Sequence, residues 1–73
     1  MVMIKNMWKM VVLLKLNGKL ISRWDFGEEL DKAIDFIYDI MEECYQVGEH
    51  HFEVVNEVNG QTYYNLRFEM KNR

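Results

Sequence analysis

The chain has 73 residues, of which 49% are hydrophobic and 29% charged, and its formal net charge at pH 7 is −3. This length predicts one domain covering residues 1–73, and the apolar content excludes a disordered chain. One cysteine excludes an internal disulfide, and the apolar run from Met10 to Leu14 is too short for a signal-peptide core or a membrane span. We therefore expect a cytoplasmic protein that does not bind membranes.

The charged residues are segregated along the chain. Residues 1–24 contain five basic residues and no acid, whereas residues 25–69 contain all twelve acids and only Lys32 and Arg67 as basic residues. This asymmetry predicts a dipolar molecule in which a basic hairpin lies beside an acidic helix.

Two Asn-Gly pairs, at residues 17–18 and 59–60, lie between runs of aliphatic, β-branched and aromatic residues. Asn-Gly in this setting is a strong signal for a β-hairpin. The sequence therefore predicts two hairpins, with strands at 7–15, 19–24, 51–57 and 61–70. Residues 1–6 are left open, since Val2 and Ile4 could extend the first strand or fray.

Alternation along these strands assigns the two faces of the sheet. Even-numbered residues are predominantly apolar and are predicted to face the helix, so odd-numbered residues face away. To keep even residues opposite even residues, each hairpin needs a three-residue loop, at 16–18 and 58–60, that ends in a left-handed glycine. Both turns are therefore predicted to be type I turns with a glycine bulge.

Apolar residues recur at steps of three and four from Phe26 to Tyr45, which predicts an amphipathic helix over 26–47. Asp25 with Glu28 resembles a capping box, and Gly48 is a natural left-handed stop. The predicted core combines the apolar side of this helix with the even-numbered strand residues: Trp8, Met10, Val12, Leu14, Leu20, Trp24, Leu30, Ile34, Ile37, Met41, Val54, Tyr64, Leu66 and Phe68.

The fold class predicted by these elements is α+β, with a ββαββ order and one helix packed on one face of a four-stranded sheet. The order of elements resembles that of immunoglobulin-binding domains of the protein G type. The resemblance implies a β-grasp fold with strand order 2-1-4-3 and implies no activity. A sheet that pairs the two middle strands, or one completed by a second chain, is the alternative.

The outward, odd-numbered face of the sheet is the first candidate site. Five apolar residues are expected near its centre, with charged residues around them: Val11, Leu13, Ile21, Val55 and Tyr63. An apolar centre with a charged rim is common in protein interfaces, although β-branched residues also favour exposed strands. We expect a small non-enzymatic protein–protein interaction module that forms a homodimer through this face or through an edge strand.

The acidic side of the helix is the second candidate site, and it carries five carboxylates: Glu28, Asp31, Asp35, Asp39 and Glu42. Steps of three and four residues place successive carboxylates about 5–6 Å apart, near the spacing of about 7 Å between phosphates of one DNA strand. The alternative function is therefore an inhibitor of the phage or mobile-element type, whose helix mimics nucleic acid in the basic groove of a nucleic-acid-binding protein. A solvated helix face is the plainer interpretation.

Catalytic residues, cofactors and metal ligands are not expected. Adjacent His50 and His51 on a strand point to opposite faces and cannot readily share one ion. Cys44 lies on the apolar side of the helix, and no glycine-rich phosphate loop is present. Nucleic-acid binding by the basic hairpin is disfavoured, because Trp8 and Trp24 are assigned to the core face, where they could not stack on bases.

Overall fold

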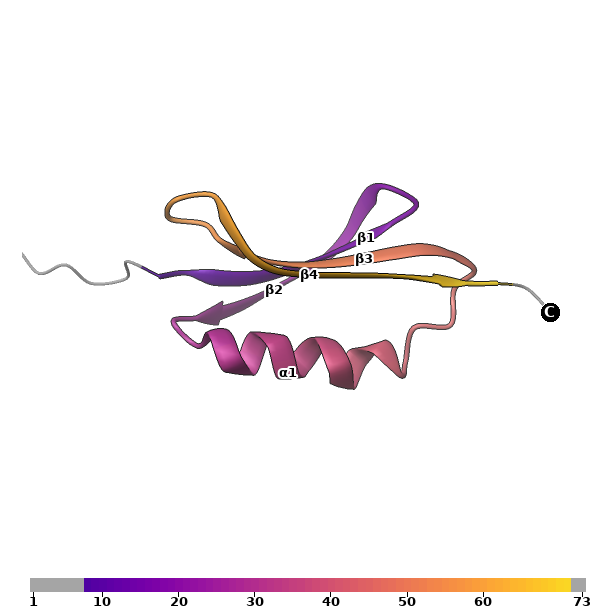
Figure 1. Cartoon of the computed structure of the whole chain (residues 1–73), viewed down its shortest axis with the longest axis horizontal. Coiled ribbons are helices and arrows are strands. Elements are labelled where there is room, and N and C mark those ends of the chain that lie inside the picture. The colour runs from indigo at the N-terminus through magenta and orange to yellow at the C-terminus, as the bar shows by residue number, and fades with distance from the viewer. Residues whose placement is uncertain (1–7, 72–73) are drawn as a thin grey trace, which may run out of the picture.

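A computed structural model of the chain describes residues 8–71. These residues form one helix and four strands in the order β1 (Met10–Leu16), β2 (Lys19–Gly27), α1 (Leu30–Met41), β3 (Gly48–Asn56) and β4 (Gln61–Met70). The predictions for Val2 and Ile4 lie outside the described residues. The α+β class and the order of elements are confirmed, and Figure 1 shows α1 lying against one face of the sheet.

The strand order is β2-β1-β3-β4 and every neighbouring pair is antiparallel. The prediction of a β-grasp order, 2-1-4-3, was therefore wrong, because β1 pairs with β3 and not with β4. The residues of β1 and β3 match on both faces of the sheet: Val11 lies opposite Val55, Val12 opposite Val54, and Leu14 opposite Phe52. β4 carries alternating polar residues, which suit the edge of a sheet better than its centre.

The predicted assignment of even-numbered residues to the helix side is confirmed for the central strands. The buried cluster on this side contains Met10, Val12, Leu14, Ala33, Ile37, Phe52 and Val54. Five residues outside the predicted core also pack against this cluster: Phe26, Phe36, Ile40, Cys44 and Tyr63. Phe36 contacts the rings of Trp24 and Phe26, with ring centroids 4.9 and 5.1 Å apart.

Two predicted core residues are largely exposed. Trp8 is 45% exposed and Leu20 is 49% exposed. Trp8 packs only at the margin of the core, against the ring of Tyr63 at a centroid distance of 5.5 Å. Leu20 lies opposite Lys15, on the outer face of the sheet, because the first turn differs from the predicted one.

The first hairpin has a two-residue loop, because Leu16 pairs with Lys19 and both Asn17 and Gly18 have positive φ. These features indicate a type I′ turn, and the predicted three-residue loop was wrong. The register then shifts, so that Lys15 pairs with Leu20 while Leu14 pairs with Ser22. The even-to-even pairing that the sequence required is thus restored by a β-bulge within the strand.

The loop of the second hairpin is instead longer than predicted, since Asn56 pairs with Gln61 and residues 57–60 form the turn. Gly60 is left-handed, as predicted, and its N–H donates to the carbonyl of Asn56 at 2.7 Å. Again the register shifts further along the strand, where Val55 pairs with Thr62 but Val54 pairs with Tyr64. Tyr63 is the extra residue of this bulge.

The helix is shorter than the predicted 26–47. Asp25, Phe26 and Gly27 belong to β2, and the Asp25 carboxylate accepts a hydrogen bond from the N–H of Gly27 at 3.0 Å instead of capping the helix. After Met41 the chain makes two tight turns, in which Glu43 and Cys44 bond back to Ile40 and Met41. Gly48 therefore begins β3 and does not end the helix.

Gly48 lies where the first turn meets the start of β3. The Asn17 side chain accepts a hydrogen bond from the N–H of Glu49 at 2.9 Å, and the Asn17 N–H donates to the Glu49 carbonyl at 2.8 Å. Gly48 has φ +136°, and a Cβ atom there would lie 2.8 Å from the Asn17 amide. The contact between the two segments thus requires both the conformation and the small size of glycine.

We expect Gly48→Ala to lower the free energy of unfolding by about 2–3 kcal/mol, through backbone strain and the contact with Asn17. Gly18→Ala is the control, because Gly18 also has positive φ but has open space around its Cα. It should cost about 1 kcal/mol from strain alone. Urea unfolding measures both, and equal losses would contradict the proposed contact.

Candidate interaction surfaces

The five predicted outer-face residues do not form one patch. Val11, Leu13 and Val55 lie on the outer face, where Val11 pairs with both Val55 and Asp25. Ile21 and Tyr63 are displaced to the helix side by the two bulges. Ile21 lines a hollow beside α1, and Tyr63 packs against the core cluster.

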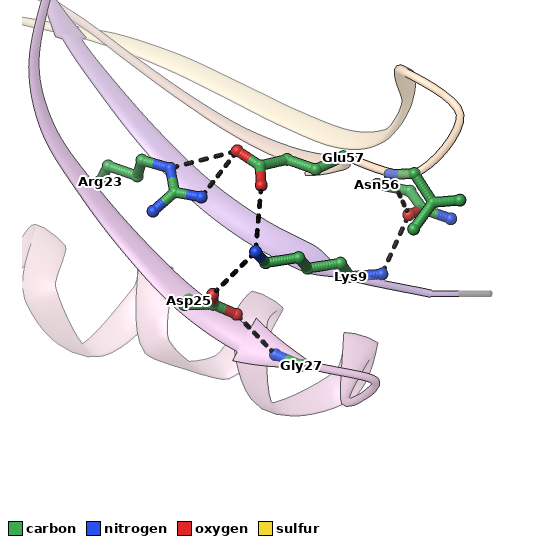
Figure 2. Close-up of polar contacts among 7 residues, drawn as sticks. Lys9, Arg23, Asp25, Gly27, Asn56 and Glu57 are labelled. Carbon is green, nitrogen blue, oxygen red and sulfur yellow. Dashed lines mark hydrogen bonds and ion pairs between the residues drawn. The ribbon is translucent and has the colours of Figure 1, made fainter. Parts of the chain in front are cut away.

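A network of ion pairs lies on the outer face beside Val11, at the start of β1 and the end of β3. The guanidinium of Arg23 contacts one carboxylate oxygen of Glu57 through Nη2 at 2.7 Å and Nε at 3.2 Å. The Lys9 ammonium lies 3.6 Å from Glu57 and 3.8 Å from Asp25. Figure 2 shows these side chains bridging β2 and the end of β3 across β1. Val11, between these strands, is fully buried.

The backbone holds Lys9 and Glu57 in place beside this network. The N–H of Glu57 donates to the Lys9 carbonyl at 2.9 Å, and the buried Asn56 side chain accepts hydrogen bonds from Lys9 and Val58 at 3.0 Å each. The hydrogen bond from Arg23 lowers the pKa of Glu57, and the same contact raises the pKa of Arg23. Both groups therefore stay charged over a wide pH range.

Two further ion pairs lie on the outer face. Lys15 lies 3.2 Å from Glu53, and Arg67 lies 3.9 Å from Glu49. Basic residues of the first hairpin thus contact acids of the second hairpin in the same chain. This arrangement argues against phosphate binding by the first hairpin, and it removes much of the charge that would drive face-to-face self-association.

A hollow of about 260 Å³ lies on the helix side, between the end of α1 and the β1–β2 hairpin. Its lining is largely apolar and includes Leu14, Ile21, Trp24, Ile40, Cys44 and His50. Burial raises the pKa of the Cys44 thiol, and the charge of Glu43 adds to this effect. A thiol that stays protonated is a poor nucleophile, so Cys44 is not activated for nucleophilic attack.

The two histidines point to opposite faces, as predicted. His50 is buried on the helix side and stacks on Phe68, with ring centroids 4.8 Å apart and planes 2° apart. Its Nδ1 lies 3.2 Å from the Gly48 carbonyl. His51 lies on the outer face, opposite Lys15 and Arg67. Among residues 8–71, no group of three or more potential ligands could hold a metal ion.

The acidic side of the helix is exposed to solvent along its length. Asp31, Asp35 and Asp39 lie within α1, Glu28 precedes it and Glu42 follows it, and all five are exposed. Within the described part of the chain, none of these five carboxylates has an ion pair, while Lys32 pairs with Glu29 at 3.3 Å. Uncompensated negative charge is therefore concentrated along the helix.

The two edges of the sheet differ in regularity. β2 contains two register shifts against β1, at Ile21 and Phe26, and bulges of this kind protect an edge from further pairing. β4 is regular from Tyr64 to Met70, where successive residues pair with Val54 to Gly48. No strand among residues 8–71 pairs with its outer side. β4 therefore offers a regular free edge.

Comparison of the chain with protein-family models, curated proteins and solved structures finds no match. No helix within residues 8–71 has the length and apolar character needed to cross a bilayer.

We expect Val11→Ala to lower the free energy of unfolding by about 2 kcal/mol, because it removes two buried methyl groups and leaves a cavity under the ion pairs. Ile21→Ala, at a side chain that is 43% exposed, should cost less than half as much. Urea unfolding of both variants tests this. A negligible loss for Val11→Ala would mean that the outer face is open.

Proposed function

We propose that this chain is a small non-enzymatic protein–protein interaction module that self-associates through its sheet. The observation that carries the proposal is the free edge of β4, which is regular over residues 64–70. An exposed edge strand presents unpaired N–H and C=O groups that readily accept another strand. The ion pairs beside Val11 make that part of the outer face a poorer docking surface.

The direction of the backbone groups supports pairing at this edge. The bonds from Glu57 to Lys9 and from Asn17 to Glu49 direct odd-numbered residues of β3 toward β1. Because these groups alternate along a strand, even-numbered residues of β3 bond to even-numbered residues of β4. The N–H and C=O groups of Asn65, Arg67 and Glu69 therefore point to the free edge.

We expect Arg67→Pro to weaken self-association by roughly tenfold or more, because proline removes an N–H from the free edge while sparing the bonds to β3. Arg67→Thr is the matched control, since it also lacks the guanidinium but keeps the N–H. Light scattering over a concentration series measures the mass of each. A single-chain mass for the unaltered protein at high micromolar concentration would contradict the proposal, as would equal association of both variants.

The acidic side of α1 supports a second candidate function, the inhibitor that occupies a basic groove of a nucleic-acid-binding protein. What favours it is the lack of compensating charge at Asp31, Asp35 and Asp39, in a molecule whose sheet charges are mostly paired. Like charges four residues apart on a helix cost stability. The acidic row therefore lowers the stability of the helix, and binding to a basic partner would offset this repulsion.

We expect Asp35→Lys to raise the free energy of unfolding by about 1 kcal/mol, because two repulsive i,i+4 pairs become attractive, and Asp35→Asn by about half as much. The double variant Asp35→Lys/Asp39→Lys should stay folded and lose any partner that double-stranded DNA displaces from the unaltered protein. Retention of that partner by the double variant would exclude the acidic row as its binding site.

A further inference from the structure

The charges along β4 leave one acid uncompensated at the free edge. Glu69 lies directly opposite Glu49 in the β3–β4 pair, and like charges at directly opposed positions destabilise a sheet. Arg67 contacts Glu49 at 3.9 Å. Within residues 8–71, Glu69 has no ion-pair partner. The edge therefore carries a repulsion that a basic group supplied from outside the chain would relieve.

A second copy of β4 supplies such a group in one particular register. For two antiparallel β4 strands related by a two-fold axis at Phe68, Arg67 of each copy lies opposite Glu69 of the other. Both residues direct their backbone groups to the free edge, so each such pair exchanges two hydrogen bonds. An axis at Arg67 would oppose two arginines, and an axis at Glu69 would oppose two glutamates.

The helix-side residues of β4 fit the same register. Leu66, Phe68 and Met70 are half-buried there, since α1 packs mainly against β1, β2 and β3. With the axis at Phe68, the two Phe68 side chains meet and each Leu66 lies opposite Met70 of the other copy. An apolar row then continues across the junction on the helix side, while the charge pairs lie on the outer face.

We infer that two copies of this chain join their β4 strands antiparallel about a two-fold axis at Phe68, with reciprocal Arg67–Glu69 pairs, into one eight-stranded sheet. This inference rests on the proposed self-association and specifies its site and register. The two-fold axis is perpendicular to the continuous sheet, so it maps each face of the sheet onto the same face. Both α1 helices therefore lie on one side of the sheet, and both acidic rows face the same way. The small contact predicts weak, concentration-dependent dimerisation.

Charge exchange at the edge tests the register. Arg67→Glu and Glu69→Arg should each raise the dimer dissociation constant by about tenfold, because each converts two attractive pairs into two repulsive ones. The double variant Arg67→Glu/Glu69→Arg should restore it to within about threefold of the unaltered protein. Glu69→Arg should also raise the melting temperature of the dilute monomer, since Glu49 then faces a basic residue. Sedimentation equilibrium measures the association.

Disulfide formation gives an independent readout in a Cys44→Ser background. Phe68→Cys should oxidise to a covalent dimer, because the Cα atoms of a non-hydrogen-bonded pair lie about 4.5 Å apart, within the range of a disulfide. Leu66→Cys, the control on the same face, should not, since its two copies would lie about 13 Å apart along the strands.

The outcomes separate the inference from the proposal on which it rests. A dimer that is insensitive to all three charge variants, or that crosslinks through position 66 and not 68, would overturn the register and leave self-association standing. A single-chain mass at all concentrations would overturn both. Rescue by the double variant together with crosslinking at position 68 would establish the register.

Discussion

The antiparallel pairing of β1 with β3 is the constraint on which the rest of this structure depends. β1 is apolar on both faces, so it is stable only with a strand on each side and with cover above and below. β3 provides matching residues, Val55 on the outer face and Phe52 and Val54 on the helix side. Once these two strands occupy the centre, β2 and β4 become the edges, and α1 packs against β1, β3 and β2.

Three β-bulges decide what each face of the sheet offers to other molecules. The extra residues Ile21, Phe26 and Tyr63 each fall on the helix side or its margin, where they enlarge the apolar surface around α1. The outer face therefore loses two of its five expected apolar residues. Of the remaining three, Val11 is fully buried beside the ion pairs among Lys9, Arg23, Asp25 and Glu57, while Leu13 and Val55 are half-buried.

The distribution of compensated and uncompensated charge connects this architecture to the proposed functions. Opposite charges of the two hairpins meet across the β1–β3 pair and satisfy each other within the chain. Among residues 8–71, the acids without an ion pair include the acidic row on α1 and Glu69 at the edge of β4. In the proposed dimer the edge charges pair with each other and the acidic rows remain exposed on one side, so the two candidate functions are compatible.

The sequence by itself determined the α+β class, the number and order of the elements, the opposite faces of His50 and His51, and the helix-side position of residues such as Val12, Val54 and Leu66. These follow from the periods of two and 3.6 residues and from local turn signals. Only the tertiary structure decided the strand order, the bulges, the burial of Val11 and the exposure of Trp8. The alternation of odd and even positions assigns a residue to a face of the sheet, but it does not say which strand edges pair. One extra residue at a bulge also reverses the face assignment of the residues that follow it. The regular free edge of β4 likewise became visible only when the register of both hairpins was known.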